Sequence, residues 1–408
     1  MISILILLLI YLTFICFGLQ DPVIGSAWPS INAALNIPLS YAGYISMIIA
    51  AGRLISSILG EKVIRRFGAG LTVSFSALIL CASLFGYSFS SSFLMLCVWS
   101  FPLSLGVGFV DVSLNNYVAL HYKAKHMNWL HCFWSTGASI GPVIMSFYLA
   151  GGLPWNAAFR MFAIFLGCLT VLLFAALPLW KKNNPPTALA VNTASAIIDH
   201  LPSGDGKVKR IYFKDLITLA GVKQALVLFF CYISLQMTIV FWGSSYLVTV
   251  KNILPETAAA WISIYYIGLT SGRLISGFLT IKLNNRQMLR LGYSIIACGI
   301  AALLLPFDSA SLMPGFLILG IGCAPIFPCL VHETPKNFGS QRSQAIIGIQ
   351  MASGNAGLLV IPPLLGKTAS VFGFNIFPYF LAVLLVTSII MFEILNKKVD
   401  RVKNQAKN

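Results

Sequence analysis

The chain has 408 residues, of which 58% are apolar and only 9% are charged, and its mean hydropathy is +0.86. Soluble domains contain about 25% charged residues, so this composition excludes a soluble domain of any size. The formal net charge is +16. The distribution of the basic residues along the chain decides whether that charge indicates nucleic-acid binding or membrane orientation.

Twelve apolar segments are long enough to cross a bilayer, which takes about 20 helical residues. Six precede a polar stretch at 181–222 and six follow it. We therefore predict an all-α integral membrane protein whose spans lie near 3–31, 40–62, 70–89, 93–120, 129–151, 156–180, 224–250, 257–281, 288–307, 310–332, 343–366 and 372–395.

A pentapeptide, Gly-Arg-Leu-Ile-Ser, occurs twice, at residues 52–56 and 272–276. Each copy lies late in an apolar segment and just before a basic turn. The offset of 220 residues is close to half the chain length, which indicates two related halves. Parallel duplicated halves of six spans each are typical of one large class of transporters, so the repeat predicts a carrier.

Basic residues are concentrated in alternate connections between the spans. Twenty-two Lys and Arg lie in one set of connections and the termini, whereas the other set holds only Arg160, Lys251 and Lys367. The positive-inside rule then places both termini and the 181–222 loop in the cytoplasm. The charge is thus an orientation signal, and we expect no nucleic-acid partner.

No pattern in the chain predicts an enzyme or a cofactor. Nine cysteines are scattered singly, with no metal-binding spacing. The string from Gly137 through Ser139 to Gly141 matches the GxSxG pattern of hydrolases, but it lies inside an apolar segment rather than at a strand–turn–helix junction. Small residues four apart in a membrane helix allow close helix packing, and we interpret the string in that way.

Several motifs identify a resemblance to the major facilitator superfamily, and within it to the fucose-permease-like branch of sugar and proton symporters. The resemblance covers essentially the whole chain, although the strict cytoplasmic signature of the superfamily is absent. It is carried by residues 20–32, the stretch from Gly52 through Arg66 to Gly68, Gly106 and Gly108 with Asp111, Asn115 and Asn116, residues 127–131, Phe327 and Pro328, Pro335 with Phe338 and Gly339, and Pro362 and Pro363 with Gly366.

The resemblance implies the major facilitator fold, in which two six-helix bundles are related by a pseudo-twofold axis and rock about a central cavity. In this chain the N-terminal bundle would comprise residues 1–180 and the C-terminal bundle residues 223–396. Residues 181–222 would form a cytoplasmic linker and residues 397–408 a basic cytoplasmic tail. We expect a monomer in the bacterial cytoplasmic membrane, with the lipid bilayer and a small solute as its partners.

Two carboxyl groups within spans are the first candidates for proton coupling. A carboxylate in hydrocarbon is costly unless it is protonated, paired or in contact with water, which makes Asp21 and Asp111 functional candidates. Asn115 follows Asp111 by one helical turn and shares its face. The alternative is that Asp111 is a permanent ion-pair partner, for instance of Arg53. His131 is a third proton-coupling candidate, and it could equally be a packing residue.

The repeat-related Arg53 and Arg273 keep their charge in proteins, so we interpret them as gating or ion-pair residues, with anion binding as the alternative. Amides and aromatic rings suit a sugar, through paired hydrogen bonds and stacking, whereas lipid-facing packing is the simpler reading of each ring. The predicted substrate-binding residues are Asn115, Asn116, Asn128, Gln236, Trp242, Tyr246, Tyr265, Tyr266, Gln350 and Asn355.

Together these features predict a secondary active transporter that works by alternating access and imports a small polyhydroxylated solute, such as a hexose or deoxyhexose, with H+. Na+ is the alternative coupling ion because Asp and Asn oxygens also bind it. The rival function is proton-driven export of a drug, siderophore or other metabolite. Many exporters carry GxxxGPxxGG in the fifth span. In this chain Pro142 is followed by Met145 and Ser146 in place of the final glycines, which favours import.

Overall fold

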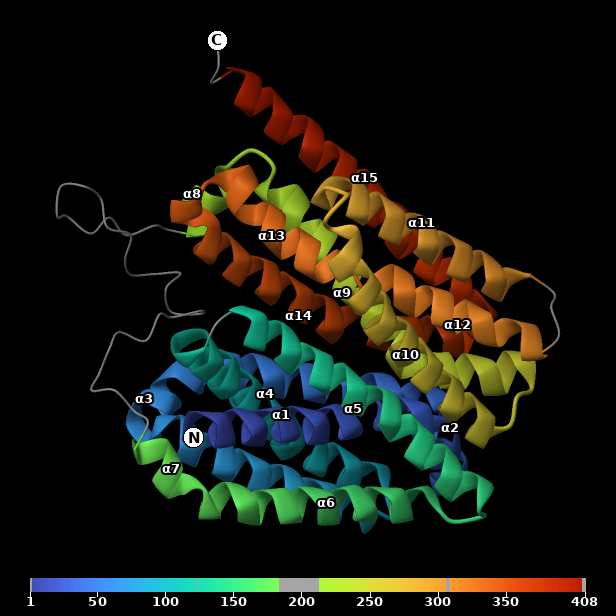
Figure 1. The fold of residues 1–408 in the computed structure, drawn as a ribbon. Helices are drawn as coiled ribbons and strands as arrows, with labels where there is room; N and C mark the ends of the chain where they lie inside the picture. Colours follow the sequence, from blue (N-terminus) through green and yellow to red (C-terminus); the bar gives the residue numbers. More distant parts are fainter. Residues whose placement is uncertain (1, 123, 183–212, 306–308, 406–408) are drawn as a thin grey trace.

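A computed structural model describes residues 2–122, 124–182, 213–305 and 309–405, almost all of which are helical (Figure 1). Most of the predicted linker, residues 183–212, lies outside the described residues. The chain forms two bundles. The N-terminal bundle is drawn in blue to green in the lower part of Figure 1, and the C-terminal bundle in yellow to red above it.

The N-terminal bundle holds the first six predicted spans. Its first span is divided at Asp21 and Pro22, and its second and third spans are one continuous helix except at Gly68, where φ is 78° and the backbone is not helical. Its elements are α1 (Ile2–Gln20), α2 (Val23–Leu35), η1 (Leu39–Tyr41), α3 (Ala42–Ser88), α4 (Phe93–His121), α5 (Ala124–Ala150), α6 (Trp155–Ala175) and the short α7 (Leu177–Lys182).

The C-terminal bundle repeats the plan, with its fourth span divided at Ala324 and Pro325. A short helix, α8 (Phe213–Thr218), leads into it. Its further elements are α9 (Val222–Lys251), α10 (Pro255–Leu279), α11 (Asn285–Leu304), α12 (Ser309–Cys323), α13 (Ile326–Phe338), α14 (Ser340–Phe372), η3 (Phe374–Ile376) and α15 (Phe377–Gln405).

Three helix pairings occur in both bundles, although α15 also packs along α9, a contact that α6 hardly makes with α1. The first span packs against the fifth (α1 with α5, α9 with α14), the second against the fourth (α3 with α4, α10 with α12), and the third against the sixth (α3 with α6, α11 with α15). Across the interface, α3 packs against α14 and α10 against α5. These matched pairs confirm the prediction of two six-helix bundles related by a pseudo-twofold axis.

Ten helical segments within the described ranges are both long enough and apolar enough to cross a membrane. The fifth and eighth predicted spans, α5 and α10, are helices of 27 and 25 residues and so are long enough, but they are not among these ten. These two helices pack on each other across the interface. Part of the surface of each therefore faces protein rather than lipid, and that part tolerates polar side chains.

The repeated pentapeptide makes the same contact in each bundle. A Cβ atom built on Gly52 would lie 2.8 Å from the Cβ of Ser104 on α4, and one on Gly272 would lie 2.7 Å from the Cβ of Ala324, just after α12. Ser104 and Ala324 are themselves separated by the repeat offset of 220 residues. The glycines thus allow equivalent helices to approach closely, and they place Arg53 and Arg273 at equivalent positions.

The glycines of the GxSxG string pack α5 against α1, which confirms the packing interpretation. A Cβ atom on Gly137 would lie 2.1 Å from the carbonyl oxygen of Ile15, and one on Gly141 would lie 1.9 Å from that of Leu19. Ser139 donates its hydroxyl hydrogen to the Ser135 carbonyl at 2.8 Å. Its hydroxyl therefore binds the backbone of its own helix.

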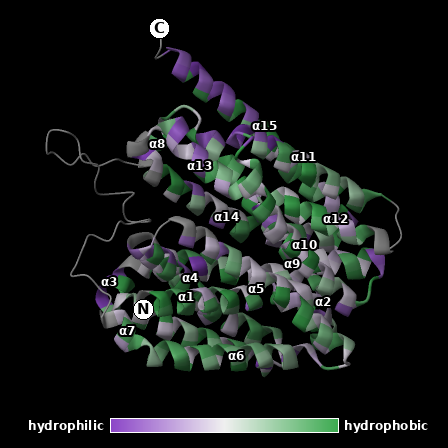
Figure 2. Ribbon diagram, viewed as in Figure 1, coloured by the Kyte–Doolittle hydropathy of each residue, from purple (hydrophilic) through white to green (hydrophobic). Residues whose placement is uncertain are grey.

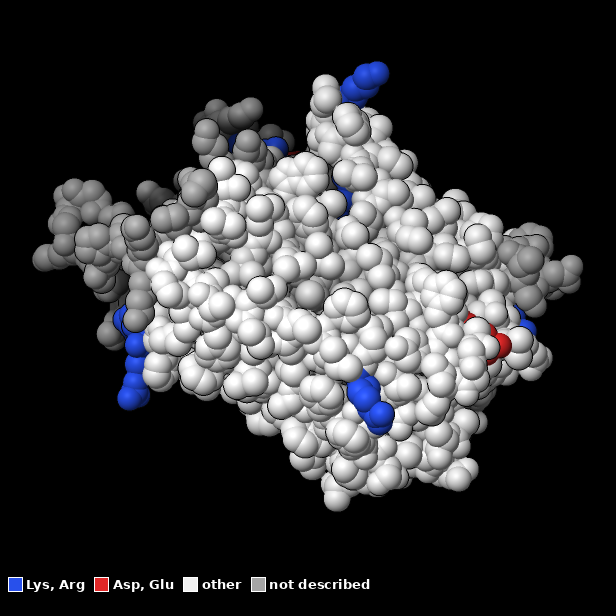
Figure 3. Space-filling model, turned by 60° about the horizontal axis from the view of Figure 1, so that its bottom comes forward, with Lys and Arg blue, Asp and Glu red and all other residues white. Residues whose placement is uncertain are grey.

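The outer surface is apolar over most of its area. Large side chains such as Phe147 and Phe278 are 74% and 76% exposed, and Figure 2 shows hydrophobic residues along most helices, with hydrophilic ones concentrated at α8, α13 and the end of α15. Figure 3 shows a broad face that carries few charged side chains. Such a surface is suited to lipid, and the chain is a multi-pass membrane protein.

The two bundles are in close contact at the end that carries the turns at 36–38, 151–154 and 252–254, which we call the outer end. The Ser244 hydroxyl donates to the carbonyl of Ser26 at 2.9 Å, and a Cβ on Gly43 would lie 2.8 Å from the Cα of Pro363. Gly25 lies against the backbone of α9. The outer end is therefore closed by backbone-to-backbone contact between α2 and α9 and between α3 and α14.

Replacing Gly25 with Ala is expected to destabilise this closed outer end. A Cβ atom there would lie 2.3 Å from the Val240 carbonyl oxygen and 2.9 Å from the Phe241 Cα, and neither backbone atom can rotate away. Overpacking of this kind costs about 1–3 kcal/mol, so the temperature of thermal unfolding in detergent should fall. Gly277→Ala is the matched control, because nothing lies within 4 Å of its Cβ position. Equal unfolding temperatures for the two variants would contradict the prediction.

Candidate functional site

Asp21 lies at the break between α1 and α2. Pro22 has no N–H to continue the helix, so the chain makes a turn in which the Asp21 N–H donates to the Gly18 carbonyl at 3.3 Å. The break exposes a carboxylate in the middle of a membrane span. The Arg53 guanidinium donates to Asp21 Oδ1, and the two groups form an ion pair whose side chains are 22% and 16% exposed.

Asp111 lies on α4 near this ion pair, within electrostatic range of Arg53 and Asp21. Its side chain is exposed. Asn115 donates its amide N–H to the Asp111 carboxylate at 2.7 Å and to its backbone carbonyl at 2.8 Å. The permanent ion pair considered above for Asp111 and Arg53 is absent from the described structure, because Arg53 pairs with Asp21 instead. Asp111 is therefore an exposed carboxyl group with an amide partner.

A small cavity between the bundles adjoins the ion pair. Its volume is about 20 Å³, which is room for one water molecule and too little for a hexose. The bundles are thus closed around the site at this level. The N-terminal bundle contributes Gln20, Asp21, Ile24, Ile49, Arg53 and Leu103, and the C-terminal bundle contributes Met237, Val240, Phe241, Tyr266 and Leu358.

Arg273 on α10 lies at the interface with α5. Its Nη1 donates to the backbone carbonyl of His131 at 3.3 Å, and it lies within electrostatic range of the imidazole of His131 and of the Tyr266 hydroxyl. The His131 ring packs edge-on against Phe14, with ring centroids 6.3 Å apart. The repeat-related arginines therefore face different partners: Arg53 a carboxylate within its own bundle, and Arg273 the backbone of the other bundle.

The predicted aromatic residues divide into two groups. Tyr266 lines the central cavity and packs edge-on against Trp134 of the other bundle at 6.0 Å, and Tyr265 packs against Tyr266 at 5.3 Å. Trp242 and Tyr246 lie inside the C-terminal bundle, where both are buried. The Trp242 indole N–H donates to the Pro362 carbonyl at 2.9 Å and the Tyr246 hydroxyl to the Leu303 carbonyl at 3.0 Å.

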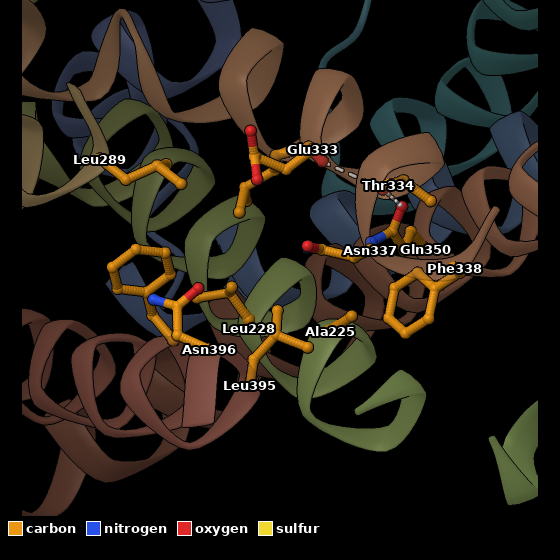
Figure 4. A pocket seen from close by; sticks show the side chains of 12 residues that line it. Ala225, Leu228, Leu289, Glu333, Thr334, Asn337, Phe338, Gln350, Leu395 and Asn396 are labelled. Atoms are coloured by element: carbon orange, nitrogen blue, oxygen red, sulfur yellow. Dashed lines mark hydrogen bonds between the residues drawn. The ribbon is translucent and has the colours of Figure 1, made fainter. Parts of the chain in front are cut away.

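Gln350 lies at a second cavity inside the C-terminal bundle, towards the end opposite to the outer end, which we call the inner end (Figure 4). The Thr334 hydroxyl donates to the Gln350 side-chain oxygen at 3.1 Å, and Glu333 and Asn396 line the same cavity. The cavity volume is about 10 Å³, close to the minimum for one water molecule. The structure therefore separates Gln350 from the ion pair of Asp21 and Arg53.

The remaining predicted residues have less direct relations to the cavity. Gln236 is buried on α9 next to Met237, which lines the central cavity, and Asn116 and Asn355 are half-buried on α4 and α14. The side chain of Asn128 lies outside the described residues. The structure thus brings Asp21, Arg53, Asp111, Asn115 and Tyr266 into one neighbourhood.

Sequence reasoning did not select Gln20, Met237 or Phe241, which also line the central cavity. Met237 and Phe241 lie in α9, which is apolar along most of its length, and such a helix gives no periodic signal of the face that meets the other bundle.

Ion pairs at the inner end of the C-terminal bundle stand apart from this site. Arg286 pairs with Asp400 at 2.8 Å and Arg290 with Glu393 at 2.9 Å, joining α11 to α15. Asn285 donates to Glu333 of α13 at 2.8 Å. These contacts hold helices of one bundle together, and they offer matched positions for control substitutions.

Comparison with known families is decisive for the class of protein. Residues 10–346 and 224–408 match the Major Facilitator Superfamily in two overlapping regions. The chain belongs to the Major Facilitator Superfamily. It is a membrane transporter rather than an enzyme, in agreement with the sequence prediction.

Curated relatives are distant. The chain is 22% identical to Bypass of stop codon protein 6 of Saccharomyces cerevisiae over 390 residues, covering 90% of this chain and 77% of that protein. It is 23% identical to the cis,cis-muconate transport protein of Acinetobacter baylyi over 369 residues, covering 88% and 86%. It is 20% identical to the glucose/mannose transporter GlcP of Bacillus subtilis over 329 residues, covering 78% and 77%.

Solved structures support the fold. The nucleoside transporter NupG superimposes with a TM-score of 0.74 at 12% identity, covering 96% of this chain and 98% of that one. A D-xylose–proton symporter superimposes with a TM-score of 0.71 at 13% identity, covering 95% and 96%. Because the sequence identities are this low, these likenesses show the fold alone.

Proposed function

We propose that this protein is a proton-coupled secondary transporter, and that it imports a small polyhydroxylated solute across a bacterial cytoplasmic membrane. We place it in the fucose-permease-like branch and expect it to act as a monomer, without a cofactor. The relatives are named as transporters of a sugar and of an organic acid. Their names agree with a small polar solute, and they do not decide between a sugar and an acid.

The observation that supports proton coupling most directly is the arrangement of two carboxyl groups around one arginine at the bundle interface. Asp21 is paired with Arg53, whereas Asp111 is exposed and bonded to Asn115. A carboxylate without a counter-ion in a membrane protein exchanges protons with any water that reaches it. Asp111 is therefore the candidate proton carrier, whereas Asp21 already has Arg53 as its ion-pair partner.

The orientation of the closed end indicates which step of the transport cycle the structure represents. If the positive-inside rule holds for this chain, the closed outer end faces the periplasm. The exposed Asp111 then has access to water from the cytoplasmic side. Such a conformation is the state in which an importer releases its proton and its solute into the cell, and also the state in which an exporter binds its solute. The import direction therefore rests on Met145 and Ser146, which stand where many exporters have glycines.

Uptake by the purified protein in liposomes tests the proposal. Sugars and sugar acids are offered under an imposed pH gradient, under an imposed Na+ gradient and with neither, and protein-free liposomes provide the control. We expect accumulation only with the pH gradient, inside alkaline. Accumulation that needs Na+ would overturn proton coupling, and solute extrusion under every gradient would favour the exporter.

The topology is tested by reporter fusions. The 22-to-3 split of basic residues predicts that fusions after Lys182 and after Asn408 report a cytoplasmic location, and that a fusion after Gly152, in the turn at 151–154, reports the opposite side. An external signal from either of the first two fusions would contradict the proposed orientation.

A further inference from the structure

The repeat duplicates an arginine, but only one of the two copies has an acid as its partner. Arg53 and Arg273 occupy equivalent positions, since Gly52 and Gly272 make equivalent contacts. Arg53 pairs with Asp21, whereas the hydrogen-bond acceptor of Arg273 is the His131 carbonyl at 3.3 Å. A carbonyl oxygen accepts a hydrogen bond, but it does not neutralise a full positive charge.

The C-terminal bundle has no carboxylate at the positions where the N-terminal bundle has its two. Asn36 and Asn252, the left-handed residues that end the first span of each bundle, map Asp21 onto Met237, and the repeat offset maps Asp111 onto Val331. The acids of the described C-terminal helices that form ion pairs, namely Glu333, Glu393 and Asp400, do so with Lys336, Arg290 and Arg286 near the inner end. Within the residues that the structure describes, Arg273 has no ion-pair partner.

The surroundings of Arg273 make this lack of a counter-ion costly. Arg273 is only partly exposed, and its electrostatic neighbours are His131 and the buried Tyr232, Tyr266 and Cys323. A cation in such surroundings needs a counter-ion or water. Tyr266 also lines the central cavity beside Asp21 and Arg53, so an anion between the bundles could reach both the cavity and Arg273.

The charge balance of the site indicates when that anion arrives. The charges of the two arginines (Arg53 and Arg273) and the two aspartates (Asp21 and Asp111) sum to zero when His131 is neutral. The site of the empty carrier then has no net charge. A proton on Asp111 raises the sum to one positive charge. One carboxylate brought by the solute would return the sum to zero, and the loaded and empty carriers could then reorient with similar electrostatic cost.

We propose that the transported solute carries a carboxylate that binds Arg273, so that the polyhydroxylated solute is a hydroxy acid of the aldonate type. This inference rests on the proposed proton coupling. Arg273 would contact the carboxylate, and the hydroxyl groups would face the amide and aromatic side chains of the interface.

Binding of matched pairs to the purified protein tests the inference. The probes are D-gluconate with D-glucose, D-galactonate with D-galactose and L-fuconate with L-fucose, which differ within each pair chiefly by the carboxylate. Affinity is measured by titration and by the rise in unfolding temperature. We expect at least one acid to bind, and to bind more tightly than its neutral partner.

Substitutions assign the effect to Arg273. Removing a charged hydrogen-bond partner should weaken binding of the acid by about tenfold or more in Arg273→Gln. Arg273→Lys keeps the charge but loses the two-pronged geometry, and it should give an intermediate loss even if the Gln variant fails to fold. Arg286→Gln, which removes the same charge at the inner end, should leave affinity unchanged.

Three results would overturn the inference: no acid of the panel binds, the neutral partner binds as tightly as its acid, or the Arg273 variants keep full affinity for the acid. Proton uptake measured in liposomes with the same solutes separates the two proposals. A neutral sugar that moves with a proton would leave the proposed coupling intact and refute the carboxylate. An acid whose binding depends on Arg273 but which moves without a proton would support the carboxylate proposal and refute the proposed proton coupling.

Discussion

Replacing Asp111 with Asn is expected to abolish proton-driven accumulation while leaving solute exchange intact. The amide imitates the protonated carboxyl group, so the carrier can bind solute and exchange internal for external molecules but cannot release a proton. Stability should change little, because Asp111 is exposed and its side-chain partner, Asn115, can donate to an amide oxygen as well. Accumulation and exchange are measured in the same liposomes, and unfolding temperature in detergent.

The matched control is Glu393→Gln, which makes the same chemical change at an exposed ion pair far from the centre. Exposed pairs contribute about 0–1 kcal/mol, so accumulation and stability should both survive. Intact accumulation in Asp111→Asn would remove this residue from the mechanism and make Asp21 the coupling candidate. A joint loss of exchange and stability would instead assign Asp111 a structural role.

Replacing Asp21 with Asn should destabilise the protein more than any other single change at the site. It leaves the Arg53 guanidinium without its carboxylate at the bundle interface. Removing one partner of a buried pair costs about 3–5 kcal/mol. The partial exposure of both side chains places this pair near the lower end of that range, and the unfolding temperature should fall accordingly.

The double variant Asp21→Asn with Arg53→Gln gives the decisive comparison, because it removes the unpaired charge together with its partner. We expect it to recover most of the stability lost in the single variant. A double variant that is no more stable than Asp21→Asn would show that the loss comes from the break at Pro22 rather than from charge. An unchanged unfolding temperature in Asp21→Asn would contradict the ion pair itself.

The gross architecture follows from the sequence because a bilayer leaves few choices. Backbone groups in hydrocarbon must bond within the segment, so each apolar run of about 20 residues becomes a helix. The repeat of Gly-Arg-Leu-Ile-Ser predicted two related halves, and the structure pairs their helices in the same way. Glycine spacing also predicted close packing of α5, because a residue without a side chain lets two helix backbones approach closely wherever they meet.

The partners of individual side chains depended on the tertiary structure. Arg53 could have paired with either carboxyl group, and only the turn at Asp21 and Pro22 decides that Asp21 is the one in contact. Trp242, Tyr246 and Gln350 lie inside the C-terminal bundle rather than at the central cavity. A helix that is apolar on every side carries no periodic signal of which face meets lipid and which meets protein.

The sequence by itself therefore determined the class of fold, the internal repeat and the polar residues available to the mechanism. Packing decided which of those residues share a cavity, because the rotation of each helix about its axis is set by its neighbours. Arg53 and Arg273 illustrate the difference between what the sequence determines and what packing determines. Their pentapeptides are identical, and only the surrounding helices provide one with a carboxylate and the other with the carbonyl of His131.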